Sequence, residues 1–304
     1  MTQPIGFIGL GHLGKHLASS LLRADFDIVV FDLNDEAVTG LVALGARRGR
    51  DPASVASQCT TVITCLPSPT AIDSVVTGNV GLLQGFTIGS TWIDMSTNDR
   101  DETLRLAELC ARRGVQVLEC PVTGGVHKAA EGDITVLVGG DSVVFDQHRH
   151  ILEAMGSPIL YMGPLGNAAT IKVITNMLAF IHLVAVGEAL MLAKQGGLEL
   201  GQAYEAIRHS SGNSFVHETE SKVILNGSYD IGFTMDLACK DLGFATDLGE
   251  KFGVPLELAT LVQNIFIRSR LQYGGHAWSS KVVKLLEDSV GTELRAPGFP
   301  ERLQ

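Results

Sequence analysis

The sequence predicts an α/β fold, in which a doubly wound parallel sheet is followed by an all-α C-terminal domain. Two observations support this division. Up to about residue 162, short apolar runs alternate with helical patterns, as in parallel sheets that are covered by helices on both faces. Beyond residue 163 the strand-like runs stop and long helical patterns take over. We therefore expect two domains, residues 1–162 and residues 163–304.

The chain opens with a strand, a glycine turn, a helix and a second strand. The apolar run Ile5 to Leu10 leads into Gly9-x-Gly11-x-x-Gly14, and the next apolar run ends at Asp32. Glycines at this spacing allow a pyrophosphate to approach the free N–H groups that open the helix, and the carboxylate can accept ribose hydroxyls. A bare glycine turn could be a plain connection, but here the required strands and helix flank it.

This opening unit predicts a Rossmann-type domain that binds a dinucleotide. The residues expected to contact the cofactor here are Gly9, Gly11, His12, Leu13, Gly14, Asp32, Leu33 and Asn34.

The carboxylate of Asp32 favours NAD as the cofactor, because it would repel the additional phosphate of NADP. Leu33 and Asn34 supply no cation that could offset this repulsion. Arg47, Arg48 and Arg50 could reach that phosphate, although such a cluster is more often a solvated loop. NAD is therefore predicted, and NADP is left open.

The first half continues as alternating strands and helices. Strands are expected at Thr61–Leu66, Thr91–Met95, Val115–Glu119, Thr135–Val138 and Ile159–Met162. Helices are expected at Glu36–Leu44, Ala53–Gln58, Asp101–Arg113 and Ser142–Met155. Pro67-Ser68-Pro69 is expected to end a strand and to begin a loop at the carboxyl edge of the sheet, where such folds bind ligands.

Two polar segments follow predicted strands at this edge. Ser96 to Asp99 could simply cap a helix, or Asp94, Ser96 and Thr97 could form part of a ligand site, and the sequence does not separate the two interpretations. Thr123-Gly124-Gly125 could present consecutive N–H groups to a carboxylate, or it could form an ordinary tight turn.

The second half is predicted to be helical after the break at Gly163-Pro164-Leu165-Gly166. The expected helices are Asn167–Lys194, Leu200–His209, Glu218–Leu225, Met235–Phe252, Leu256–Gln272 and Ser279–Asp288, with an irregular tail from Arg295 to Gln304. Lys172 and Asn176 lie one turn apart on the first of these helices and therefore share a face. A random lysine is usually a solvated surface residue, but a polar pair on an apolar helix requires an explanation.

The composition narrows the class of partner. A net charge of -10 argues against a nucleic-acid surface, and 45% hydrophobic with 18% charged residues is typical of a soluble globular protein. Five scattered cysteines without a C-x-x-C pair indicate reduced thiols, so a cytoplasmic location is expected. His148 and His150 point to different sides of a helix and have no obvious third ligand, so no metal site is expected.

The long apolar helix raises the question of a membrane. Ile171 to Ala193 is interrupted by Lys172, Asn176, His182 and Glu188, so we expect a helix buried within the protein rather than a span. Burial against a second subunit is also expected, which predicts a homodimer or a homotetramer.

Taken together, the motifs resemble those of the β-hydroxyacid dehydrogenase family, which includes 3-hydroxyisobutyrate dehydrogenase and tartronate semialdehyde reductase. The matching stretches are G-F-I-G-L-G-H-L-G (Gly6 to Gly14), D-M-S-T (Asp94 to Thr97), P-V-T-G-G-V (Pro121 to Val126), G-P-L-G-N-A-A-T-I-K-V-I-T-N (Gly163 to Asn176) and K-D-L (Lys240 to Leu242). They occur in the family's order. This chain departs from the family in having Ala168 where glycine is frequent and Thr175 where a paired asparagine is frequent.

The resemblance implies a role for each matched residue. Lys172 would be the general acid/base and Asn176 would orient the substrate, while Thr123, Gly124 and Gly125 would hold its carboxylate. Ser96 would lie near the nicotinamide and the substrate, Thr97 would contact the cofactor, and Leu66 and Pro67 would border its adenine or ribose side. Lys240 would reach the cofactor, with Phe233 packing nearby. The polar loop Ser210–Ser214, and Asn213 within it, is either a substrate-selecting segment or a plain connector.

The implied reaction is hydride exchange between the nicotinamide and a small β-hydroxyacid or semialdehyde. Lys172 can remove the hydroxyl proton only if its pKa falls from about 10.4 toward the working pH. A non-catalytic NAD-binding scaffold and a reductase of imines or larger sugar acids are the alternatives. Retention of Lys172 argues against the imine reductases, which generally have another residue there.

Overall fold

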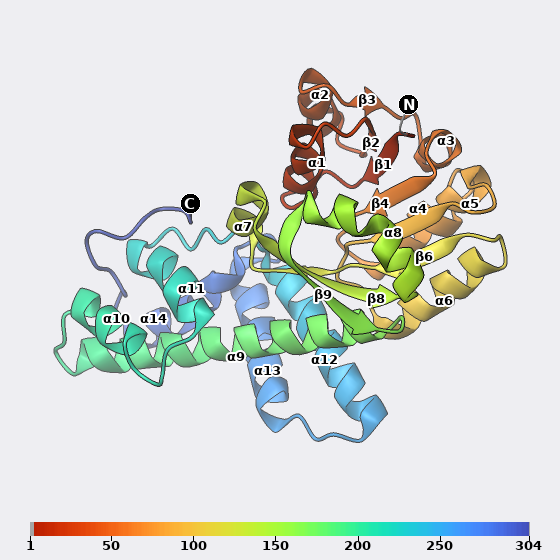
Figure 1. Cartoon of the computed structure of the whole chain (residues 1–304). Helices are drawn as coiled ribbons and strands as arrows, with labels where there is room; N and C mark the ends of the chain where they lie inside the picture. Colours follow the sequence, from red (N-terminus) through yellow and green to blue (C-terminus); the bar gives the residue numbers. More distant parts are fainter. Residues whose placement is uncertain (1–2, 304) are drawn as a thin grey trace. The chain divides into compact units, whose positions relative to one another are not determined.

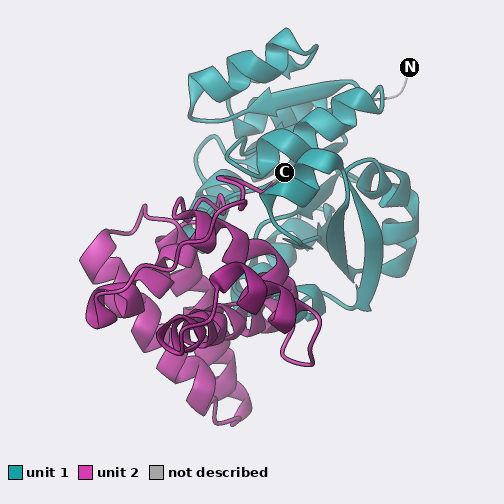
Figure 2. Cartoon of the chain, turned by 90° about the vertical axis from the view of Figure 1, so that its left-hand side faces the viewer, with its two compact units in different colours: residues 1–172 teal, residues 173–304 magenta. Residues whose placement is uncertain are grey.

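The computed structural model describes residues 3–303, and the chain separates into two compact units, Met1–Lys172 and Val173–Gln304 (Figure 2). The division falls inside helix α9 (Asn167–Gln195). The domain boundary expected at residue 163 stays a prediction.

The first unit is built on one large sheet (Figure 1). Its strands are β1 (Ile5–Ile8), β2 (Ile28–Phe31), β3 (Arg47–Arg48), β4 (Thr61–Thr64), β5 (Thr91–Asp94), β6 (Gln116–Glu119), β7 (Val122–Thr123), β8 (Ile134–Gly140) and β9 (Gly156–Gly163). They lie in the order β3-β2-β1-β4-β5-β6-β8-β7, with β9 beside β8. The strands from β3 to β6 are parallel, and β8 is antiparallel to β6 and β7. This is the Rossmann order, and the strand order reverses at β1 and β4.

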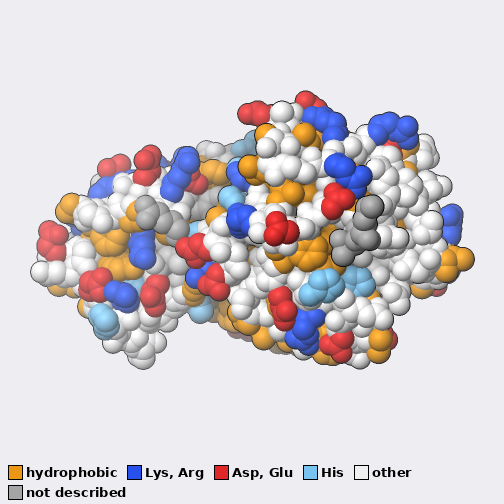
Figure 3. Space-filling view, turned by 45° about the horizontal axis from the view of Figure 1, so that its top comes forward, with side chains coloured by type: hydrophobic (Ala, Val, Ile, Leu, Met, Phe, Trp, Pro, Cys, Tyr) orange, Lys and Arg blue, Asp and Glu red, His pale blue; other side chains and the backbone are white. Residues whose placement is uncertain are grey.

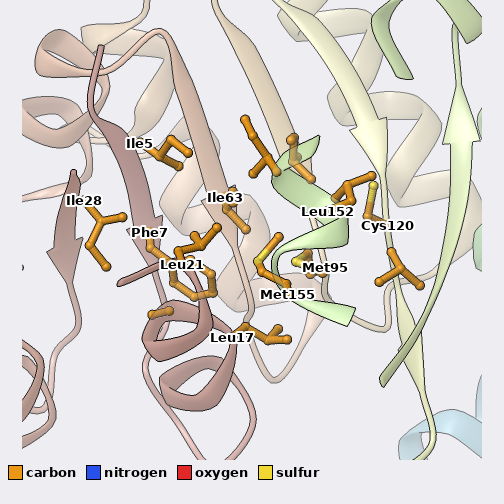
Figure 4. Close-up of a cluster of buried hydrophobic side chains, with 14 of the residues drawn as sticks. Ile5, Phe7, Leu17, Leu21, Ile28, Ile63, Met95, Cys120, Leu152 and Met155 are labelled. Atoms are coloured by element: carbon orange, nitrogen blue, oxygen red, sulfur yellow. The ribbon is translucent and has the colours of Figure 1, made fainter. Parts of the chain in front are cut away.

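Helices cover both faces of this sheet. They are α1 (Gly14–Arg23), α2 (Asp35–Ala43), α3 (Pro52–Gln58), α4 (Pro69–Thr77), α5 (Leu82–Gly85), α6 (Arg100–Ala111), α7 (Val126–Glu131) and α8 (Ser142–Glu153). Side chains alternate across a strand, so β4 directs Ile63 to the face covered by α1 and α8, and Val62 to the face covered by α3 and α4. Figure 4 shows Leu17 and Leu21 of α1 and Leu152 of α8 in the first of these layers.

The predictions from sequence were wrong or incomplete for several short elements. Arg47 and Arg48 form the edge strand β3, paired with β2, rather than a loop. The segment after Pro67 is not a loop, because Ser68 caps α4 and Pro69 occupies its first position. That signal was present in the sequence, since proline is favoured at the start of a helix. The six-residue helix α7, the two-residue strand β7 and the four-residue helix α5 carry too few residues to show a period.

The second unit is helical, as predicted. It contains the rest of α9, then α10 (Leu200–Arg208), α11 (Phe215–Asn226), α12 (Met235–Phe252), α13 (Glu257–Tyr273), the 3₁₀ helix η1 (Ser279–Val283) and α14 (Lys284–Val290). The helix predicted over Ser279–Asp288 is therefore divided. Within residues 173–303 the only β pairings are two isolated bridges, Asp230 with Arg302 and Thr234 with Trp278.

Helix α9 has 29 residues, and by length and composition alone it could cross a membrane. One such helix is weak evidence, because core helices of soluble proteins meet the same two criteria. Inside the second unit α9 supplies Phe180, Leu183 and Leu190 to the hydrophobic core, while Leu192 remains exposed.

Candidate functional site

The glycine turn lies at the carboxyl end of β1, and its glycines serve two purposes. Gly9 has a φ of +95°, and a Cβ there would overlap the carbonyl oxygen of Cys65. A Cβ on Gly14 would overlap the carbonyl oxygen of Gly9, so these two glycines permit the fold itself. A Cβ on Gly11, in contrast, would meet no heavy atom within 4 Å. Gly11 therefore keeps clear a space outside the polypeptide.

Asp32 is fixed at the end of β2 by two backbone donors. Leu10 N–H donates to Oδ2 over 2.6 Å, and Asn34 N–H donates to Oδ1 over 2.7 Å. The first of these bonds ties the carboxylate to the glycine turn. Each oxygen keeps acceptor capacity, because a carboxylate offers about four lone-pair positions. The predicted ribose-accepting role is therefore compatible with these bonds.

The three arginines near this edge all have carboxylate partners. Arg47 pairs with Asp27 at 3.1 Å, Arg48 pairs with Asp35, and Arg50 pairs with Asp51 at 2.7 Å. On the face shown in Figure 3, acidic and basic side chains are interspersed. A bound 2′-phosphate would have to compete with these pairs for an arginine.

Buried hydrogen bonds link the ends of β4 and β5. The Trp92 indole donates to Thr64 Oγ1 (2.9 Å), and that hydroxyl donates to Asp94 Oδ1 (2.9 Å). The Ser96 hydroxyl donates to the same Oδ1 (2.6 Å) and accepts the Leu66 N–H (2.9 Å). A hydroxyl has one donor and two acceptor positions, so Ser96 can still accept one further hydrogen bond. Helix capping belongs to Asp99, which accepts two N–H groups of α6.

The Thr123-Gly124-Gly125 turn joins β7 to α7. Gly124 and Gly125 have φ values of +125° and +89°, a region that other residues rarely adopt. The two glycines carry no side chains of their own, although His127 and Lys128 lie within 3.1–3.5 Å of where their Cβ atoms would be. Lys128 in α7 pairs with Asp133 at 2.7 Å.

Glu119 is a buried carboxylate that sequence reasoning missed. It ends β6, and it accepts N–H groups at the start of α9 from Gly166 (2.6 Å), Ala168 (2.9 Å) and Ala169 (3.2 Å). Burial raises the pKa of Glu119 to about 7, while the hydrogen bonds from Ala168 and Gly166 oppose the rise. A glutamate beside Cys120-Pro121 carried no recognisable signal, because its partners lie far along the chain.

Lys172 lies in the second turn of α9 and is only 7% exposed. It therefore does not have the solvated position that is usual for a lysine. Ala168, one turn earlier on the same face, is fully buried. Its methyl group, the predicted departure from the family, is packed inside the protein.

In the second unit, α9 and α12 bring the predicted site residues Asn176 and Lys240 to one carboxylate, that of Asp241. The Asn176 amide donates to Asp241 Oδ2 over 2.6 Å, and Lys240 Nζ lies 2.8 Å from Asp241 Oδ1. Lys240 also lies over the Phe244 ring. Asp241 is 1% exposed, and its carboxylate is the buried partner of both Lys240 and Asn176.

Other predicted site residues also have contacts within their own unit. Asn213 donates to Glu218 and accepts the Ser214 N–H, so its amide already holds the Ser210–Ser214 loop. Phe233 packs on Phe180 in the helical core. His148 is hydrogen-bonded to Thr61 and Val144, and residues 3–303 contain no cluster of three His, Cys, Asp or Glu side chains suited to a metal.

These residues fit a dinucleotide on the first unit. The space over Gly11 suits a pyrophosphate, the α1 N-terminus favours its negative charge, and Asp32 suits a ribose hydroxyl. All three lie around the carboxyl ends of β1 and β2, next to the position where the strand order reverses.

Comparison with known proteins gives the same assignment for both units. Residues 4–163 match the NAD binding domain of 6-phosphogluconate dehydrogenase, and residues 166–286 match the NAD-binding domain of NADP-dependent 3-hydroxyisobutyrate dehydrogenase. The chain is 33% identical to 2-(hydroxymethyl)glutarate dehydrogenase of Eubacterium barkeri, over 95% of this chain and 97% of that one. It is 32% identical to NAD-dependent L-serine dehydrogenase of Pseudomonas aeruginosa, over 94% and 98%.

One relative is not named as a dehydrogenase. The human cytokine-like nuclear factor N-PAC is 30% identical over 88% of this chain, which spans about half (48%) of that protein.

Solved structures share the fold over almost the whole chain. The crystal structure of 3-hydroxyisobutyrate dehydrogenase from Salmonella typhimurium superposes with a TM-score of 0.86 and 28% identity, covering 93% of this chain and 100% of that chain. Both halves match the family in sequence, and the overall fold matches that of a solved 3-hydroxyisobutyrate dehydrogenase. The chain therefore belongs to the β-hydroxyacid dehydrogenase family.

Proposed function

We propose that this protein is an NAD-dependent dehydrogenase of small β-hydroxyacids, with Lys172 as the general acid/base. The observation that carries the proposal is the burial of Lys172 on an apolar helix, one turn before Asn176. Buried lysines are common acid/base groups in enzymes.

The names of the relatives indicate a substrate skeleton. L-Serine, 3-hydroxyisobutyrate and 2-(hydroxymethyl)glutarate are all 3-hydroxypropanoates that differ only in the substituent on C2. The constant part is a primary alcohol one carbon away from a carboxylate. We assign this constant part to the residues that the chain shares with its family, and the C2 substituent to residues that vary.

Each site residue has a separate role in the proposed reaction. When bound, NAD would supply the hydride acceptor for the alcohol carbon. Neutral Lys172 removes the hydroxyl proton, and in the reverse direction protonated Lys172 donates it to the carbonyl oxygen. The glycine turn after Thr123 holds the carboxylate, and the remaining acceptor position of Ser96 receives a donor from the ligand. Asn176 and Lys240 are held by Asp241 for substrate and cofactor contacts.

NAD rather than NADP is the proposed cofactor. Asp32 is fixed at the end of β2, and the nearby arginines are already paired with carboxylates.

The test is a panel of 3-hydroxyisobutyrate, L-serine, 2-(hydroxymethyl)glutarate and glycerate, each with NAD and with NADP, followed by the absorbance of the reduced nicotinamide. We expect turnover with at least one of the four, and more with NAD than with NADP. NADH binding without turnover on any substrate of the panel would contradict the proposal. It would favour the second candidate, a non-catalytic nucleotide-binding module, for which the nuclear-factor name of one relative is the supporting observation.

The proposed partners are the small carboxylate substrate and further copies of this chain. The proposed location is the cytoplasm, and neither nucleic acid nor a membrane is proposed as a partner. Exposed leucines on α9 and α13, namely Leu178, Leu258 and Leu261, support a homodimer or homotetramer, because apolar side chains on the outside of a helical domain are commonly covered by a second subunit.

A further inference from the structure

Helix α9 begins without a capping side chain of its own. The residue before its first turn is Gly166, which has a φ of +92° and no side chain. The amide of Asn167 is directed instead to the carbonyl oxygen of Met162, over 2.8 Å. The first N–H groups of a helix have no partners within the helix, so they need acceptors from elsewhere.

Glu119 supplies these acceptors from the end of β6. Its Oε1 accepts the N–H groups of Gly166 and Ala168, and its Oε2 accepts that of Ala169. The sheet is shaped to hold this carboxylate, because a Cβ on Gly139 of the neighbouring strand β8 would overlap Oε1. A side chain from the sheet thus does what a capping residue of the helix would normally do.

On its other side β6 pairs with β5, which leads into the serine of the proposed site. Glu119 lies opposite Asp94 in the register of β5 and β6, and Asp94 holds Ser96. Lys172 follows Ala168 by one helical turn on the same face. The backbone from the N–H groups that Glu119 binds to Lys172 is therefore the start of a single helix, and a shift of that start would move the Lys172 side chain with it.

We propose that Glu119 is a positioning residue for Lys172: by binding the first turn of α9, it fixes the ammonium relative to the end of the β5–β6 pair. This inference rests on the proposed function, in which Lys172 is the acid/base. Because a misplacement of about 1 Å can cost about a hundredfold in rate, the anchoring matters even though Glu119 touches neither substrate nor cofactor.

The test compares Glu119→Gln and Glu119→Ala with the wild type at pH 8, with the best substrate of the panel. In Glu119→Gln, Oε1 can still accept two N–H groups, but the side-chain NH₂ group replaces Oε2. This donor then faces the N–H group of Ala169, so that hydrogen bond is lost. We expect kcat to fall about tenfold to a hundredfold, while the dissociation constant of NADH changes less than twofold. Amide exchange over residues 167–172, followed by mass spectrometry, should quicken at least tenfold.

Asp141→Asn is the matched control. The Asp141 carboxylate caps α8 through the N–H groups of Val143 (2.8 Å) and Val144 (3.1 Å), so it performs the same task on a helix without a proposed site residue. This variant should loosen the start of α8 and leave kcat unchanged.

Three results would overturn the proposal: wild-type kcat in Glu119→Gln, unchanged exchange over 167–172, or a loss of NADH affinity as large as the loss of kcat. If Glu119→Ala does not fold, the glutamine variant decides. Exchange requires no substrate, so an inactive wild type would refute the proposed function while the exchange rates still test the hold of Glu119 on α9.

Discussion

Substituting alanine at Gly11 and at Gly9 should separate cofactor binding from folding. Gly11→Ala places a methyl group where the protein has no heavy atom within 4 Å, so the free energy of unfolding should change by less than about 1 kcal/mol. The same methyl group would push a pyrophosphate away from the turn. Losing one charge-assisted hydrogen bond costs about 1.5–3 kcal/mol, which corresponds to about a tenfold to hundredfold weaker affinity for NADH.

Gly9→Ala should instead damage the fold. Its φ of +95° costs a non-glycine residue about 1–3 kcal/mol, and overlap with the Cys65 carbonyl adds about as much again. For a unit of 172 residues, about 2–6 kcal/mol corresponds to a fall in Tm of roughly 5–20 °C.

The assay is a thermal melt of each variant without ligand, together with a titration of NADH by protein fluorescence. If Gly11→Ala bound NADH as tightly as the wild type, the space above Gly11 would not be the pyrophosphate site. If Gly9→Ala melted at the wild-type temperature, the steric argument would be wrong.

Three further predictions concern the cofactor, the buried glutamate and the subunit contact. Asp32→Ser should shift the affinity ratio toward NADP at least fivefold, whereas Asp27→Ser, which frees Arg47, should not; equal shifts in both variants would contradict the role of Asp32. For Glu119, the folded pKa of about 7 lies above the ordinary 4.5, so its contribution to stability is complete below pH 4.5 and is lost as the pH rises toward 7. Between pH 5 and pH 8 the free energy of unfolding of the wild type should therefore fall by about 3 kcal/mol relative to that of Glu119→Gln, which has no carboxyl group to titrate at this position. If the unfolding free energies of the two proteins depended on pH in parallel, the raised pKa of Glu119 would be refuted. Light scattering should give at least twice the chain mass of 32.4 kDa, and Leu261→Asp should lower it; a monomeric wild type would contradict the oligomer.

The elements that the sequence predicted are those with enough residues to show a period. The long helices α9, α12 and α13, and the buried strands β4 and β5, lie within a few residues of their predicted positions. The glycine turn was recognisable because its spacing is fixed by backbone geometry. Strand β3 was missed because two arginines do not resemble a strand, and their pairing depends on β2.

The candidate site was predictable only in part. Lys172 stood out because a charge interrupts an apolar helix, and Asp32 because it ends a strand after the glycine turn. The hydrogen bonds from Thr64 through Asp94 to Ser96, and the contacts of Glu119, join residues that are distant in the chain. No local pattern encodes such contacts, since they depend on which strands become neighbours in the sheet.

The most direct test of the account is turnover by Lys172→Met. Methionine keeps the length and the apolar stem but removes the proton that lysine takes and returns. Lys194→Met is the control, because Lys194 lies exposed near the end of the same helix. The account predicts NADH affinity within twofold of the wild type and kcat lower by at least about a hundredfold in Lys172→Met alone. A kcat within tenfold of the wild-type value in that variant, with the same substrate, would contradict it.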